Sequence, residues 1–543
     1  MQKLKSSLNE SLNERLQAKY PHLELAVLPL SQVNKDNESK RIDSEYFKKE
    51  YLENEKIISN HFKILGEISA KICNGSTPTN GEFENSGIPF YRSQDFDLLD
   101  TEPKQYVTID FHNSLLRSKV KYRDILVAII GATLGKIGFV RKDIMEANIN
   151  QNIAKISIID KDFNPYFIAT FLDSYYGQYQ IFRLATQTAQ EYLNNIQVSK
   201  IKIPILPKDF QLEIEKLVKD SHKALEDSKA LYKEAENLLC ESLGLDSTNP
   251  LESLLIPISS LRGSEADEAI HKLKMDCHAD KSARNDENSP LFVSGQSSSP
   301  SLSTSGARGW VNTHNDDIIA KYQHLNISIR QLSQSYGKSG RIDSKYYQSK
   351  YDAIERTIKD YKGGCCKLES SEIKDTNFIP KTQEKYRYIE LANIGNNGNI
   401  SEPLEDLGAN LPTRARRKVK TGDFIMSSIE GSLASCAIIT PEFDGCLVST
   451  GFYVLNSTKL NSETLLVLFK SAFFQEFLKK FPSGTILTAI SKDKLLNVLI
   501  PKIDFTTQEQ IASKIQKSFA LRKVAKDLLE SAKFKVECAI DSK

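Results

Sequence analysis

The chain contains the same sequence pattern twice, at a spacing of about 300 residues. The paired segments keep their order: AKYPHLELAVLPLSQ from Ala18 and AKYQHLNISIRQLSQ from Ala320; RIDSEYFKKEY from Arg41 and RIDSKYYQSKY from Arg341; KVKYRDIL from Lys119 and KVKTGDFI from Lys418; an Ile-Pro pair at Ile203 and at Ile500. A repeat of this length restricts the fold to two copies of one unit.

Each copy ends in the pattern of a long amphipathic helix, at Gln211–Leu243 and at Gln508–Ile540. Neither stretch contains Pro or Gly. Small residues share one heptad core position beside the leucines, namely Ser221, Ser228 and Ala235 in the first stretch and Ser518, Ala525 and Ala532 in the second. Because small residues allow close helix approach, the sequence predicts an antiparallel intramolecular coiled coil.

Between these landmarks, strand-like β-branched runs broken by Gly, Asn and Pro alternate with helical stretches, which predicts an α+β fold. The expected divisions are an N-terminal repeat block 1–60, a globular domain 61–207, a central long helix 208–245, a flexible Ser-rich linker 246–317, a second repeat block 318–364, a second globular domain 365–503 and a C-terminal long helix 504–543. The fold is therefore expected to be two pseudo-symmetric globular domains separated by the two long helices.

Composition narrows the functional classes. The 543 residues, 40% of them hydrophobic, suffice for several cores. The longest apolar run, Ile125–Ala132, is too short to span a bilayer, and the N-terminus lacks a signal-peptide core, so we expect a cytoplasmic protein without membrane contact. The eight cysteines form no CxxC pair, and the net charge is +2. Any nucleic-acid contact must therefore come from local basic patches.

Two stretches resemble catalytic motifs. IGATLGK at Ile130 lacks one residue of a phosphate loop and has Ile137 where Ser or Thr would hold magnesium, so we interpret it as a tight turn between buried strands. Asn164–Phe167 lacks one Pro of the tetrapeptide found in adenine methyltransferases, and Asn before Pro is an ordinary helix cap. The sequence thus predicts no catalytic residues, no metal site and no cofactor.

Two clusters of cations precede the apolar central strands of the two copies. They are Arg117, Lys119 and Lys121, with Arg123, in the first copy, and Arg414, Arg416 and Lys418, with Arg417 and Lys420, in the second. Alternation in an extended segment would place these cations on one face, where they could neutralise phosphates. The alternative is a solvated edge strand protected by lysines.

Loop residues supply candidates for reading bases. They are Ser76, Thr77, Arg92, Ser93 and Gln94 in the first copy, and Asn393, Asn396, Asn397 and Thr413 in the second. Asn and Gln can pair with adenine through two hydrogen bonds, and Arg can pair with guanine. Each of them could instead be a turn former. Since these loops differ between the copies, the two domains are expected to recognise different ligands of one class.

The chain resembles the DNA-specificity subunit of type I restriction-modification systems over nearly its whole length, through GSTPTNGEFENSGIPFYRSQDF, RDILVAIIGATLGKIGF, PTRARRKVKTGDFIMSS and VSTGFYVL. It departs from the family at Arg123, where Gly is more usual before the Asp, and in its long Ser-rich linker. The resemblance implies a non-catalytic subunit that reads a split double-stranded DNA target and holds two methyltransferase subunits. Through that complex, endonuclease and translocase subunits are recruited. The alternatives are a stand-alone adenine methyltransferase and a coiled-coil scaffold that binds no DNA.

The resemblance and the helix length together predict the distance between half-sites. Gln211–Leu243 has 33 residues, so a continuous helix is about 50 Å long, or roughly fifteen base pairs of duplex. Inserting seven residues after Lys223, matched in the C-terminal helix, preserves the heptad register and adds about 10 Å. We expect the recovered DNA motif to keep both half-sites and gain roughly three unread base pairs. A motif with its original spacer would show that the helices do not set the distance.

Overall fold

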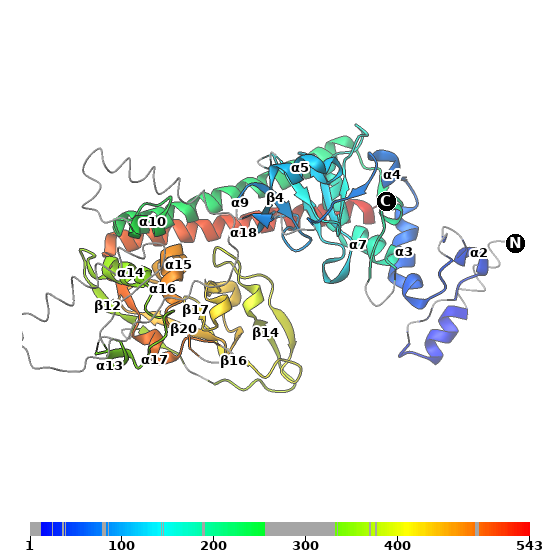
Figure 1. Cartoon of the computed structure of the whole chain (residues 1–543). Coiled ribbons are helices and arrows are strands. Elements are labelled where there is room, and N and C mark those ends of the chain that lie inside the picture. Colours follow the sequence, from blue (N-terminus) through cyan, green and yellow to red (C-terminus); the bar gives the residue numbers. More distant parts are fainter. Residues whose placement is uncertain are drawn as a thin grey trace, which may run out of the picture. The chain divides into compact units, whose positions relative to one another are not determined.

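The computed structural model describes residues 12–255 and 332–542, except for residues 24, 26, 35–36, 38–39, 79–82, 85, 102, 143, 145, 187–190, 334, 369–370, 375–376 and 484–487 (Figure 1). The chain forms two compact units. Unit 1 comprises Met1–Ser228 and Ala520–Lys543, and unit 2 comprises Lys229–Phe519. The residues of the long helices α9 (Lys208–Ser242) and α18 (Phe505–Asp541) are therefore each divided between the two units.

Unit 1 contains three sheets, and within each sheet neighbouring strands are hydrogen-bonded in the following order. They are β1 (Phe62–Ile64) with β11 (Lys202–Pro204); β2 (Cys73–Asn74), β10 (Ile153–Ile156), β7 (Ile125–Ala128) and β8 (Ile137–Phe139); and β3 (Phe83–Glu84), β5 (Gln105–Val107), β4 (Ile88–Tyr91), β9 (Ala147–Ile149) and β6 (Lys119–Val120). Its strand pairs are antiparallel except for β4 and β9, which are parallel. That parallel pair brings two chain-distant strand ends together.

The helices of unit 1 enclose these sheets. They are α2 (Leu30–Val33), η1 (Ser44–Phe47), α3 (Lys49–Ile58), α4 (Leu65–Ile68), α5 (Ile109–Ser114), η2 (Leu116–Ser118), η3 (Gly131–Thr133), α6 (Pro165–Asp173), α7 (Tyr175–Leu184) and α8 (Asn195–Ser199). Apolar residues of α6, together with Ile125 and Val127 of β7, pack into one buried cluster with the C-terminal part of α18.

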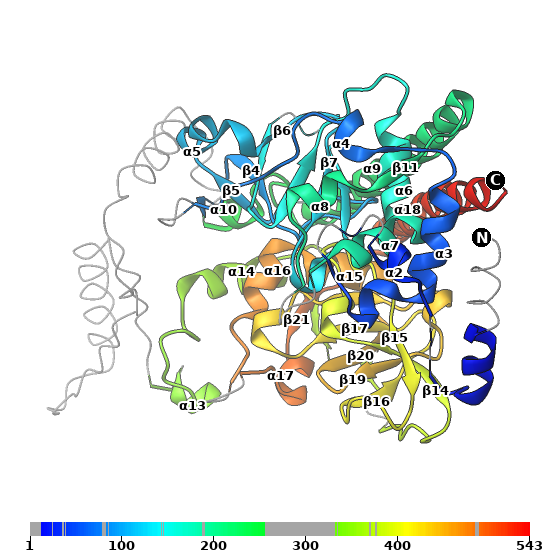
Figure 2. The same ribbon diagram turned by 90° about the vertical axis from the view of Figure 1, so that its right-hand side faces the viewer.

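Among the described residues, unit 2 repeats the first two sheets and has four strands in the third, where unit 1 has five. Its sheets are β12 (Cys365–Lys367) with β21 (Leu499–Pro501); β13 (Ser371–Ile373), β20 (Phe452–Ser457), β17 (Phe424–Ser427) and β18 (Cys436–Ile438); and β15 (Leu404–Leu407), β14 (Lys385–Ile389), β19 (Leu447–Ser449) and β16 (Ala415–Lys418). Figure 2 shows the last two sheets of this unit together. The parallel pair is now β14 with β19.

Unit 2 keeps counterparts of α3, α6, α7 and α8 and differs from unit 1 in its shorter helices. Its helices are α10 (Pro250–Leu255), α13 (Tyr336–Ser339), α14 (Ser349–Lys359), η6 (Leu391–Asn393), η7 (Glu430–Ser432), η8 (Pro441–Phe443), α15 (Ser462–Lys470), α16 (Ala472–Leu478) and α17 (Lys492–Leu496). Helix α10 corrects the expectation of a flexible linker at its beginning, because residues 250–255 are helical and Leu254 packs on the core. The rest of that predicted linker, 256–317, lies outside the described residues, as do 1–11 and 318–331 of the repeat blocks.

The same hydrogen bonds join the globular part to the start of the long helix in both units. Gln211 accepts from the Asn164 backbone at 2.7 Å and donates to the carbonyls of Leu206 and Asp162. In unit 2 Gln508 accepts from Asn461 at 2.8 Å and donates to the carbonyls of Ile503 and Lys459. Because each glutamine satisfies buried backbone groups, it fixes where its helix begins.

Within each unit, the parts of α9 and α18 run antiparallel along a seam of small residues. In unit 1 the Ser221 hydroxyl donates to the Ala525 carbonyl at 2.6 Å, and Glu213 pairs with Lys535. In unit 2 Glu234 pairs with Lys514. Ser221, Ala525, Ala235 and Ser518 are buried. The predicted seam and its antiparallel direction are confirmed.

Candidate nucleic-acid interface

In unit 1 three loops meet where the parallel strands β4 and β9 end. Tyr91 lies beside Ile149 in the register, and the Asn150 backbone donates to the Tyr91 carbonyl. The loop that follows β2 joins them, because the Ser76 backbone donates to the Ile149 carbonyl at 3.1 Å. The fold thus gathers residues 75–78, 92–95 and 150–152 at one edge of the sheet.

Glycine is required at the point of closest approach. A Cβ on Gly75 would lie 1.9 Å from the Ile149 carbonyl oxygen, far inside van der Waals contact. The backbone of the loop therefore lies directly against the end of β9. This contact positions Ser76 and Thr77.

The polar side chains of this cluster bond to one another. Arg117 donates to the Ser76 hydroxyl at 2.8 Å, and the Thr77 hydroxyl donates to the Gln151 side-chain carbonyl. Thr77, Gln151 and Arg117 are exposed. Gln151 was not among the predicted base readers, although the polar run Asn150–Asn152 directly after a strand was a usable signal.

Arg92 is held by a buried carboxylate. Its guanidinium contacts both oxygens of Asp95, at 3.1 and 3.3 Å, and the Asp95 side chain is 0% exposed. This pair fixes the direction of Arg92 but neutralises much of its charge. Ser93 is half-buried and Gln94 is exposed beside it.

The predicted one-sided row of cations in unit 1 is wrong. Arg117 lies in the short helix η2, Lys119 begins the two-residue strand β6, and the chain then turns. Arg123 has a positive φ of 73°, and its guanidinium lies over the Tyr166 ring at 5.8 Å. Lys119 donates to Asn113 at 3.0 Å, and Lys121 is exposed. A short helix and a left-handed residue replace the extended segment that alternation requires.

In unit 2 the predicted base-reading residue Asn393 is engaged within the fold. It accepts from the Glu390 backbone at 2.7 Å and donates to Ser401 and to the Glu402 carbonyl, both at 3.0 Å. Through these bonds the side-chain amide of Asn393 caps the short helix η6. Asn396 and Asn397 lie in the turn that the bond from the Gly395 backbone to the Asn399 carbonyl closes.

In unit 2, Arg414 lies beside the end of the parallel strands β14 and β19. Its carbonyl accepts from the Thr450 backbone just after β19. Its guanidinium contacts the Tyr388 hydroxyl and the Glu390 carboxylate, each at 3.2 Å. These two partners raise the pKa of Arg414. Arg414 and the neighbouring Thr413 are exposed.

A β-bulge interrupts the cation row of unit 2. The register of β16 against β19 shifts between Ala415 and Arg417. Arg416 turns back to donate to the Thr413 carbonyl at 2.7 Å, and Lys418 is exposed with its ammonium 5.5 Å from the Phe378 ring. Because a bulge re-aims the side chains that follow it, alternation fails here too. Arg414 is thus an exposed cation at the end of the parallel pair, whereas Lys418 is exposed beside Leu447, where β19 begins.

The two interpretations of catalytic lookalikes are confirmed. Gly131 and Gly135 have φ values of +67° and +86° in the short turn between β7 and β8, whose residues are buried. Asn164 caps α6, with Pro165 in the first turn, and its side chain accepts from the Tyr166 backbone at 3.0 Å. Among the described residues, no group of three His, Cys, Asp or Glu side chains could hold a metal ion. No helix in the described parts is long and apolar enough to cross a membrane.

Comparison with known proteins gives structural neighbours only. No protein-family model and no curated protein matches the chain. Among solved structures, the chain resembles the S subunit of a type I restriction-modification system from M. genitalium. The two sequences are 11% identical, the match covers 88% of this chain and 95% of that chain, and the TM-score is 0.37. The HsdS subunit from Thermoanaerobacter tengcongensis shares 13% identity over 88% and 96% of the two chains, with a TM-score of 0.24. These structure neighbours are type I S subunits.

Proposed function

We propose that the chain binds a bipartite double-stranded DNA target and serves as the specificity subunit of a type I restriction-modification system. The observation that carries this proposal is the repeated scaffold with different polar side chains at its equivalent edges. In unit 1 that edge presents Thr77, Gln151 and Arg117, and in unit 2 it presents Thr413 and Arg414. Two similar domains with different readers suit two different half-sites.

The test is selection of binding sites by the full chain from a random duplex library. The expected product is two short specified stretches with an unread spacer of constant length. Enrichment of one contiguous motif would contradict a bipartite target, and no enrichment over random sequence would contradict sequence-specific binding.

The cations near the sheet edge of unit 2 are proposed to contact phosphates. Replacing Arg414, Arg416 and Lys418 by Ala is expected to weaken binding to all duplexes alike and to lower the slope of log K against log salt by up to about 3, since each phosphate contact contributes about 0.9. Gel-shift titration at several salt concentrations measures both effects.

A matched control removes three exposed lysines of the same unit, Lys359, Lys362 and Lys479. This variant has the same net charge and should leave the salt slope unchanged. Loss of discrimination at a single base pair in the first variant would instead make those residues base readers.

Catalysis is proposed to reside in two partner methyltransferase subunits, which in turn recruit endonuclease and translocase subunits. In the stretch Asn164–Phe167 that suggested methyl transfer, the Asn164 side chain accepts from the Tyr166 backbone and donates to the Glu215 carboxylate, and the Asn164 backbone donates to Gln211. The isolated chain should therefore transfer no labelled methyl group to duplex DNA. Transfer that disappears in Asn164→Ala would favour the stand-alone methyltransferase.

A further inference from the structure

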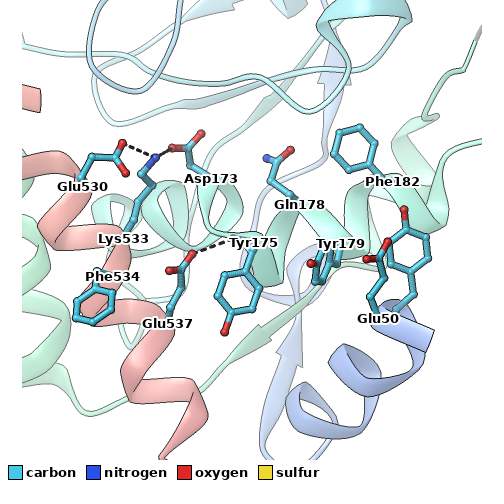
Figure 3. Close-up of a pocket in the computed structure, with 11 residues that line it drawn as sticks. Glu50, Asp173, Tyr175, Gln178, Tyr179, Phe182, Glu530, Lys533, Phe534 and Glu537 are labelled. Atoms are coloured by element: carbon cyan, nitrogen blue, oxygen red, sulfur yellow. Dashed lines mark hydrogen bonds and ion pairs between the residues drawn. The ribbon is translucent and has the colours of Figure 1, made fainter. Parts of the chain in front are cut away.

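Unit 1 has a pocket of about 680 Å³ outside the proposed DNA edge (Figure 3). Helices α3, α7 and α18 line it, together with the last residue of α6. Its aromatic members form a connected wall, with ring centroids of Tyr51 and Tyr179 at 5.7 Å and of Tyr175 and Tyr179 at 5.8 Å. On the opposite wall Phe534 is 66% exposed. Phe534 therefore offers an exposed aromatic side chain to an occupant of the pocket.

Carboxylates surround the aromatic wall. The lining contains Glu50, Asp173, Glu530 and Glu537, with Lys533 as its basic residue. Lys533 contacts Asp173 at 3.3 Å and Glu530 at 2.7 Å, and Glu537 accepts from the Tyr175 backbone at 3.0 Å (Figure 3). Glu50 is exposed. One ammonium among four carboxylates leaves an excess of negative charge beside aromatic faces, which is the environment that a guanidinium or ammonium prefers.

The second copy of the repeat indicates which kind of element could occupy the unit 1 pocket. The equivalent surface of unit 2 lies between α14 and α16, and there α10 packs against both helices. Leu254 of α10 contacts the buried cluster of that unit. A short helix from the chain itself thus occupies in unit 2 the place that is a pocket in unit 1.

The charges at the equivalent positions differ. Aligning the repeats places Lys350 and Lys479 of unit 2 where unit 1 has Glu50 and Phe182. In unit 2 both ammoniums pair with Glu476, at 2.7 and 2.8 Å. The preference of the unit 1 pocket for a basic occupant therefore comes from its own carboxylates.

We propose that the unit 1 pocket docks a short amphipathic helix of a partner protein, which places a Lys or Arg side chain among the carboxylates and an apolar side chain on Phe534. This goes beyond DNA recognition and does not depend on it. Helix-in-groove docking of this kind takes its affinity from the apolar anchors and its selectivity from charge.

A tethered probe tests the pocket in the full chain. Residues 246–255 (DSTNPLESLL) are copied after Lys543 through a short Gly-Ser linker, once unchanged and once with Lys in place of both acids. Tethering supplies an effective concentration in the millimolar range. Hydrogen exchange of residues 173–184 and 530–541 reports occupancy. The basic probe is expected to slow exchange there by about tenfold and the acidic probe by much less.

Two variants assign the effect to the pocket. Glu50→Lys introduces the residue that unit 2 has naturally and should remove most of the protection by the basic probe. Glu53→Lys, an exposed change on the same helix outside the lining, should leave it intact. Protection by neither probe overturns the docking site, and equal protection by both overturns the preference for a basic partner.

Discussion

Replacement of Asp423 by Ala is expected to destabilise the sheet of β17 and β20 by about 3–5 kcal/mol, because it strands a partly buried ammonium without its counter-charge. Asp423 is 2% exposed. Its carboxylate accepts from Lys374 at 2.6 Å, from Asn456 at 3.0 Å and from the Lys420 backbone at 2.9 Å. Removal of the carboxylate leaves all three donors unsatisfied.

The repeat provides the matched comparison. Asp124 occupies the same position in unit 1 and accepts from the Lys121 backbone at 2.7 Å and from Ser157 at 2.5 Å. Among the described residues no ammonium forms an ion pair with it, although the charge of Lys155 acts on it from nearby. Burial raises the pKa of Asp124. Asp124→Ala should therefore cost only about 1–3 kcal/mol, the cost of unsatisfied neutral donors.

Native-state hydrogen exchange on β17 and on β7 measures the two effects separately. Adding Lys374→Met to Asp423→Ala should restore part of the stability, since it removes the uncompensated charge. Equal losses in the two single variants would mean that the ammonium does not add to the cost.

The features that the sequence predicted well are those that depend on local pattern. The long helices and their small-residue seam follow from periodicity and from the repeat. The Asn164 cap was predictable for the same reason, because an N-cap bonds within its own turn.

The features that it missed depend on tertiary register. The cation rows looked continuous, yet a positive φ at Arg123 and a bulge after Ala415 redirect the side chains. Gln151 meets Thr77 only because β4 and β9 pair in parallel and their ends adjoin. The helical start of the predicted linker depended on apolar contacts of Leu254 with helices far along the chain.

Gly75→Ala is expected to abolish recognition of one half-site while leaving the other intact. The added Cβ would meet the Ile149 carbonyl oxygen at 1.9 Å and the Asn150 carbonyl oxygen at 2.5 Å, and both are backbone atoms that cannot swing away. The loop must move outward by about 1 Å or more to reach ordinary contact distance. Ser76 and Thr77 then lose their partners Arg117 and Gln151.

Loss of one or two well-placed base contacts should lower discrimination at the unit 1 half-site by about tenfold to a hundredfold, since each contributes about 1–3 kcal/mol. Site selection with the variant should therefore return the unit 2 half-site alone. Gly431→Ala is the control, because nothing lies within 4 Å of its added Cβ. If site selection with Gly75→Ala returned an unchanged bipartite motif, the loop would not be part of the DNA interface. Loss of both half-sites would mean that the substitution acts on the fold as a whole rather than on one reading edge.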